Sequence, residues 1–75
     1  MNKNAIQFML QQNKHDIRYL EEAIAYLRQA KSKADVAGYL EDEYEAHTDL
    51  KYAKAMLKKY VAAQKMLKKT MKGSV

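Results

Sequence analysis

The sequence contains no cysteine and no proline, and only two of its 75 residues are glycine. Without cysteine the chain forms neither a disulfide nor a thiolate metal site, which fits a reducing compartment. Without proline, and with glycine only at Gly38 and Gly73, little interrupts a helix elsewhere. Most of the chain consists of alanine, leucine, lysine, glutamate, glutamine and methionine, the residues that lose least on entering a helix. We therefore expect an all-α fold.

Long apolar runs are also missing. No stretch approaches the roughly 20 apolar residues that cross a bilayer, and residues 1–16 lack the apolar core of a secretory signal. We expect a cytoplasmic protein with no membrane partner. A chain of 75 residues forms one domain at most, and it buries so little surface that its stability is marginal without further contacts.

What the sequence does have is two seams of residues spaced by three and four, as at the a and d positions of a coiled coil. The first seam is Ile6, Leu10, Asn13, Ile17, Leu20, Ile24 and Leu27. The second is Leu50, Ala53, Leu57, Tyr60, Gln64, Leu67 and Met71. They are mirror images, so folding back near Gly38 pairs residues whose numbers sum to 77. This pattern predicts an antiparallel two-helix hairpin.

The polar layer selects the register, because sliding one helix by a heptad would also align two apolar seams. Only the 77 register places Asn13 opposite Gln64, where each buried amide can bond the other. We expect a single domain over 1–75, with helices at about 5–37 and 39–72 and Asn4 as the N-cap.

The region around the turn supports two interpretations. Gly38 suits the left-handed position just beyond a helix end and divides the chain into equal arms, so we prefer a turn there. Ser32 to Asp35 has the spacing of a capping box, which would add a short third helix at about 33–47. Four residues off the seam suggest that the loop end packs by a different pattern: Val36, Leu40, Tyr44 and His47.

Charge is unevenly distributed in this basic chain, whose net charge is +5. The second helix opens with an acidic run, which suits the helix dipole and lies beside the basic end of the first helix. The run is Glu41, Asp42, Glu43, Glu45 and Asp49, and the nearby cations are Arg28, Lys31 and Lys33. The opposite end, here called the basic pole, holds Lys3, Lys14, Lys58, Lys59, Lys65, Lys68, Lys69 and Lys72 with Asp16.

The two sides of the seam also differ, because in an antiparallel pair e positions face e positions and g positions face g positions. The e and b positions form a charged edge: Lys14, Arg18, Glu21, Arg28, Lys51, Lys54, Lys58, Lys65, Lys68 and Lys72. The g and c positions form what we call the Tyr/Met edge: Met9, Tyr19, Ala23, Tyr26, Ala30, Tyr52, Met56, Ala63 and Met66. Gln12, Asp16 and Lys59 interrupt it.

Two helices cannot cover the Tyr/Met edge themselves, and an apolar patch left in water marks an interaction site. We expect two hairpins to pair through it into a four-helix bundle, with its alanines allowing close approach. The alternative is that its Tyr and Met residues contact a different protein.

The residues needed for catalysis or metal binding are not suitably spaced. His47 lacks the Glu-x-x-His spacing of a ferritin-like site, and Glu41, Asp42 and Glu45 lack carboxylates opposite them for Mg²⁺. The hydroxyls of Ser32, Thr48, Thr70 and Ser74 have no His and acid partners at workable spacing. We expect no enzyme, no cofactor or metal and no small-molecule substrate.

Nucleic acid is the strongest alternative partner. Lys51, Lys58, Lys65 and Lys72 recur every seven residues and form one outer stripe, with Lys68 and Lys69 nearby. The chain has only two arginines, and no side chain that reads or stacks on bases is interleaved with the stripe. A membrane-surface helix over 51–72 ranks last, because its apolar residues are used by the seam.

The sequence therefore predicts a small non-enzymatic regulatory protein, an inhibitor or accessory protein, that acts as a helical-hairpin homodimer and binds another protein. A non-specific nucleic-acid-binding dimer is the alternative. Small accessory and inhibitor proteins of bacteria and phages often have this size and helical composition, which is an analogy only.

Overall fold

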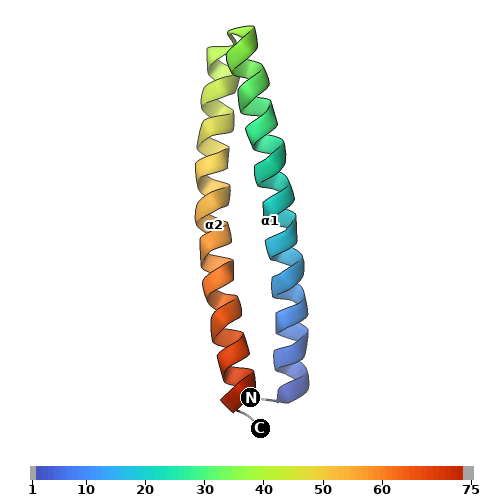
Figure 1. Cartoon of the computed structure of the whole chain (residues 1–75). Coiled ribbons are helices and arrows are strands. Elements are labelled where there is room, and N and C mark those ends of the chain that lie inside the picture. The colour runs from blue at the N-terminus through green and yellow to red at the C-terminus, as the bar shows by residue number, and fades with distance from the viewer. Residues whose placement is uncertain (1, 74–75) are drawn as a thin grey trace.

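The computed structural model describes residues 2–73, which form two antiparallel helices joined by a tight turn (Figure 1). Helix α1 spans Lys3–Ala37 and helix α2 spans Leu40–Gly73. The predicted all-α hairpin is confirmed. The alternative third helix over 33–47 is wrong, because α1 continues without a break to Ala37.

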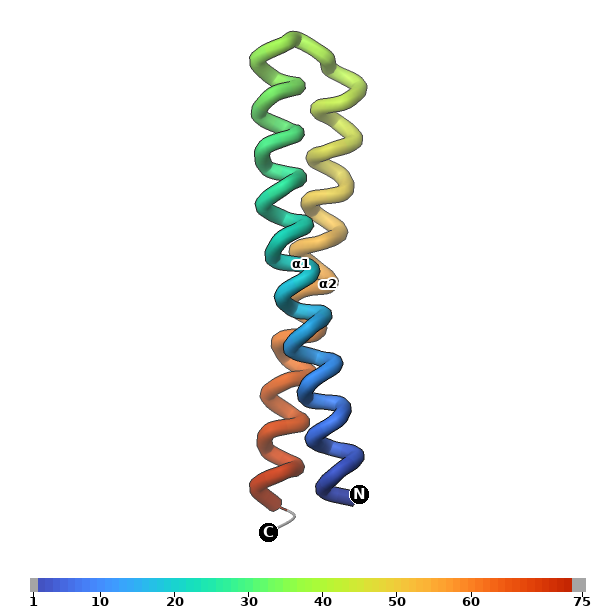
Figure 2. The backbone as a smooth tube through the Cα atoms, turned by 90° about the vertical axis from the view of Figure 1, so that its right-hand side faces the viewer, coloured from blue at the N-terminus to red at the C-terminus, as the bar shows by residue number. Residues whose placement is uncertain are grey.

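The hairpin is a rod rather than a compact globule. Its Cα atoms extend over 56 × 14 × 12 Å, with a radius of gyration of 16.8 Å. A compact domain of this length would have a radius of gyration of about 11 Å. The helices run side by side for their whole length and cross near the middle (Figures 1 and 2). Each helix can therefore contact only one other, and most of its circumference faces outward.

The seam between the helices is the one the sequence predicts. Ile24, Leu50 and Ala53 form a buried cluster, against which the half-buried Leu27 and Leu57 pack. The 77 register pairs Ile24 with Ala53 and Leu27 with Leu50, so the cluster confirms this register. Every other seam residue is buried or half-buried: Ile6, Leu10, Asn13, Ile17, Leu20, Tyr60, Gln64, Leu67 and Met71.

The expected amide pair between Asn13 and Gln64 does not form. Asn13 is 9% exposed, and its Nδ2 donates to the backbone carbonyl of Tyr60 at 2.9 Å. Its Oδ1 is buried and has no hydrogen-bond partner among the described residues. A helical carbonyl points toward the residue four positions later, so the Tyr60 carbonyl oxygen lies near the predicted height of Gln64. The partner differs because a helical carbonyl keeps a second lone pair, whereas the half-buried Gln64 can turn toward water.

A Schellman motif reverses the chain. Gly38 adopts the left-handed conformation, with φ 77° and ψ 20°. The Tyr39 N–H donates to the Ala34 carbonyl at 2.9 Å and the Gly38 N–H to the Asp35 carbonyl at 3.2 Å, the bonding pattern of this motif. The next helix begins at once, since the Glu43 N–H donates to the Tyr39 carbonyl at 2.9 Å.

The first helix begins earlier than predicted. Asn2, not Asn4, is the N-cap, because the Asn2 side chain accepts a hydrogen bond from the Asn4 N–H at 2.8 Å. The Ile6 N–H donates to the Asn2 carbonyl at 3.1 Å. Asn4 thus takes a place in the first turn, where its own N–H needs the cap.

The loop end packs by the same seam, contrary to the expectation of a different pattern. The buried residues there are Ala34 and Ala46, whereas Val36, Leu40 and Tyr44 are exposed. A turn this short holds the helices close together, so small side chains fill the seam beside it. His47 is also exposed, and its Nδ1 lies 3.0 Å from the Lys31 Nζ.

Candidate interaction surfaces

The large residues of the Tyr/Met edge lie on the surface of the hairpin. Tyr19, Tyr26, Tyr52 and Met66 are 68–72% exposed, and Met9 is 41% exposed. The smaller members Ala23, Ala30 and Ala63, with Met56, are half-buried because they lie nearer the seam. The edge therefore has small residues beside the seam and large apolar side chains on its outer side.

At the loop end, the Tyr/Met edge continues into an acidic groove. Leu27, Ala30, Ala34, Ala37 and Ala46 line its apolar part. The charged residues around it are Lys33, Asp42, Glu45 and Asp49, and Tyr39 completes the lining. This end of the edge therefore carries net negative charge, which the sequence interpretation assigned only to the start of the second helix.

The six lysines proposed to contact nucleic acid are all exposed on α2: Lys51, Lys58, Lys65, Lys68, Lys69 and Lys72. Over residues 2–73 the one ion pair joins Arg18 to Glu22 at 3.5 Å, and it lies on the surface of α1. The six ammonium groups therefore have no carboxylate partner within the described part of the hairpin. They remain available to an acidic ligand.

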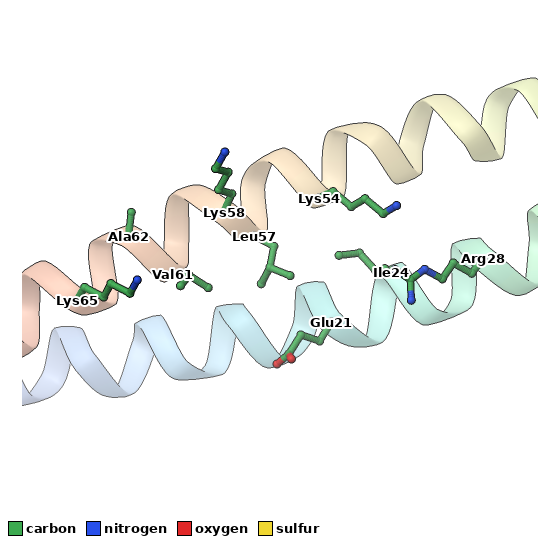
Figure 3. Close-up of a pocket in the computed structure, with 9 residues that line it drawn as sticks. All are labelled: Glu21, Ile24, Arg28, Lys54, Leu57, Lys58, Val61, Ala62 and Lys65. Carbon is green, nitrogen blue, oxygen red and sulfur yellow. The ribbon is translucent and has the colours of Figure 1, made fainter.

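A groove on the charged edge was missed by the sequence reasoning (Figure 3). Its volume is about 720 Å³, and its apolar lining comprises Ile24, Leu57, Val61 and Ala62. Its charged residues are Glu21, Arg28, Lys54, Lys58 and Lys65. Ile24 and Leu57 point into the space between the helices (Figure 3). We call this feature the cationic groove.

Val61 is the signal in the sequence that could have revealed this groove. It occupies an e position, where the neighbouring e positions of α2 hold Lys54 and Lys68. In the structure Val61 is half-buried beside the seam, and Ala62 next to it is exposed. Two consecutive apolar residues thus interrupt an edge that the sequence reasoning treated as uniformly charged.

No group of three or more potential metal ligands occurs between residues 2 and 73. The hydroxyls of Thr48 and Thr70 donate to backbone carbonyls one turn earlier, those of Tyr44 and Met66, at 3.0 and 2.9 Å. Neither described helix contains a segment long and apolar enough to cross a membrane.

Comparison with known proteins adds no relative. No protein-family model matches the chain, and no match was found among curated proteins or solved structures.

Proposed function

We propose that this chain is a small non-enzymatic regulatory protein, an inhibitor or accessory protein of the cytoplasm. It acts as a helical-hairpin homodimer whose two copies pair through the Tyr/Met edge into a four-helix bundle, and it binds another protein. The exposed aromatic and methionine side chains of this edge carry the proposal, because a lone hairpin leaves them in water.

The accessible surface of the chain supports a dimer. It amounts to 6206 Å² for a mass of 8.7 kDa. A compact monomer of this mass exposes roughly 4,700 Å², so the hairpin exposes about 1,500 Å² more. A standard interface covers about 800 Å² of each partner. Pairing through one edge would therefore remove much of the excess.

The composition of the monomer core points the same way. Over residues 2–73, three of the seven buried apolar residues are alanines, namely Ala34, Ala46 and Ala53. An alanine contributes far less apolar area than a leucine or isoleucine, so this core provides little hydrophobic stabilisation. Burial of Tyr26, Tyr52 and Met66 against a second copy would supply what the seam lacks.

The mass in solution tests the dimer. Light scattering should give twice the 8.7 kDa chain mass for the parent, and the chain mass for Tyr26→Glu and Met56→Glu. A carboxylate at either position would have to be desolvated within the bundle. Tyr44→Glu is the matched control, because Tyr44 is as exposed as Tyr26, at 72%, but lies off the edge.

Two results would contradict this assignment. The first is a parent protein with the mass of one chain. The second is dissociation of the dimer by Tyr44→Glu as complete as that caused by Tyr26→Glu. In the second case the contact would lie near the loop end rather than along the Tyr/Met edge.

Non-specific nucleic-acid binding is the second candidate, and the unpaired lysines of α2 favour it. Lysine contacts to phosphates give an affinity that falls steeply as salt rises. Affinity for a random DNA duplex should therefore be measured at two salt concentrations, for the parent and for a variant with Lys58, Lys65 and Lys72 changed to Glu. Affinity that depends on neither salt nor these lysines would exclude this candidate.

A further inference from the structure

The cationic groove combines two properties on the edge of the hairpin opposite the Tyr/Met edge. Its apolar lining includes Ile24 and Leu57 from the seam, together with Val61 and Ala62 from α2. Four cations and one carboxylate surround this lining, from both helices. A ligand that matches it must therefore offer an apolar face with carboxylates on either side.

We propose that the cationic groove binds an acidic amphipathic helix of a partner protein. This inference rests on the proposed role as an interaction protein and names the chemistry of the partner. A third helix fits the space beside two antiparallel helices, because its apolar stripe packs between them while its flanking side chains reach the groove's cations.

The arrangement of the charges favours a helix over a small anion. Lys54, Lys58 and Lys65 follow one another at intervals of four and seven residues along α2, and Arg28 lies on α1 at the Lys54 end of the groove (Figure 3). The three lysines span about 16 Å at the helical rise per residue. Cations distributed over this length match several carboxylates repeated along a helix, whereas one carboxylate would contact only part of the groove.

The apolar lining distinguishes this partner from nucleic acid. Phosphates need cations but no hydrophobic contact, and a binding surface for single strands uses aromatic side chains that stack on bases. The groove has no aromatic residue among those that line it. Val61 and Ala62 would therefore contribute nothing to a phosphate backbone, but they would contact the apolar stripe of a helix.

A second copy of this chain is a poor match for the groove. In a twofold dimer the same patch meets itself, so Arg28, Lys54, Lys58 and Lys65 of one copy would approach the same cations of the other. Like charges brought together at an interface oppose association. The Tyr/Met edge has no such row of cations and remains the surface for dimerisation.

The test uses the full chain and a labelled three-heptad peptide with leucine at a and d and glutamate at the other positions. The groove variant changes Lys54, Lys58 and Lys65 to Glu. The matched control changes Lys51, Lys69 and Lys72, exposed lysines that do not line the groove, so its net charge is identical. Circular dichroism confirms that both variants are helical.

Fluorescence anisotropy should show peptide binding to the parent and to the matched control, with about tenfold or greater weakening for the groove variant. Val61→Asp, which adds a carboxylate to the apolar lining, should weaken binding likewise. A scrambled peptide of the same composition should not bind, since its apolar residues no longer form a stripe.

Three outcomes would overturn the proposal. Equal loss of affinity in the groove variant and the matched control would show a response to net charge alone, as nucleic acid would produce. If the scrambled peptide bound as tightly as the designed peptide, the groove would not require a helical partner. If the groove variant had the mass of one chain in solution, the groove would be the contact between two copies of the chain and not a site for a partner helix. Dimerisation itself is tested separately by Tyr26→Glu, so the two proposals can fail independently.

Discussion

Replacing Asn13 by leucine tests what the polar layer contributes to the hairpin. Among residues 2–73, the Asn13 side chain makes one hydrogen bond, to the Tyr60 carbonyl, and its buried Oδ1 has no partner. An unsatisfied buried acceptor costs about 1–3 kcal/mol, whereas one net hydrogen bond contributes about 0.5–1.5 kcal/mol. The Tyr60 carbonyl remains in the hydrogen-bond pattern of α2 after the change. Leucine also adds apolar surface to the seam.

We therefore expect Asn13→Leu to stabilise the hairpin by about 2 kcal/mol, which raises the melting temperature by roughly 8–16 °C for a domain of this size. Urea unfolding followed by circular dichroism measures this change in the free energy of unfolding. All variants are compared at one chain concentration, because association contributes to stability. Gln29→Leu is the control, since Gln29 is exposed on α1 and its change should stay within about 0.5 kcal/mol.

A loss of 1 kcal/mol or more in Asn13→Leu would refute this reasoning, because the buried amide would then be net stabilising. The polar layer should have its effect on specificity instead. A single buried amide fixes register and oligomeric state at the expense of stability. The leucine variant should therefore show a mixture of masses by light scattering where the parent shows one.

Two further predictions concern the turn and the core, both read from urea unfolding. Gly38→Ala should destabilise the hairpin by about 1–2 kcal/mol, because a Cβ at Gly38 meets no atom within 4 Å and only the left-handed backbone opposes it. Gly38→Asn should destabilise the hairpin less than Gly38→Ala, because asparagine tolerates the left-handed conformation better than alanine does. If Gly38→Ala were as stable as the parent, alanine would not be strained at this position. Ile24→Ala should cost about 2–5 kcal/mol, since Ile24 is 7% exposed within the central cluster. A loss below 1 kcal/mol would mean that this cluster does not hold the helices together.

The fold was predictable because two signals agree. The seam spacing defines which face of each helix is buried, and Gly38 marks the reversal, whose tight turn places the seam residues of the two helices opposite each other. The amide pair that the sequence argument used to select the register does not form, because Asn13 donates to the Tyr60 carbonyl instead. Each signal depends on residues close together in the sequence or on a simple symmetry between the halves. The partner of Asn13 was not predictable, because backbone carbonyls are present at every height and leave no mark in the sequence.

The surfaces were only partly predictable. Exposure of Tyr19, Tyr26 and Tyr52 follows from their heptad positions, once the seam is known. The cationic groove depends on how the apolar side chains of Leu57 and Val61 lie relative to the neighbouring helix, which a charge pattern does not contain. The different packing expected at the loop end was wrong because the closeness of two helices beside a tight turn is a tertiary constraint.

The tight turn at Gly38 also determines how much chain entropy is lost when each contact between the two helices forms. In the 77 register the sequence separation between partners grows steadily from Leu27 and Leu50 to Ile6 and Met71. A contact between two seam residues far from the turn closes a long loop of chain, which costs entropy. Each layer that forms nearer the turn shortens the loop that the next layer must close. We therefore expect the layers beside the turn to form first and the layers beside the chain ends to form last.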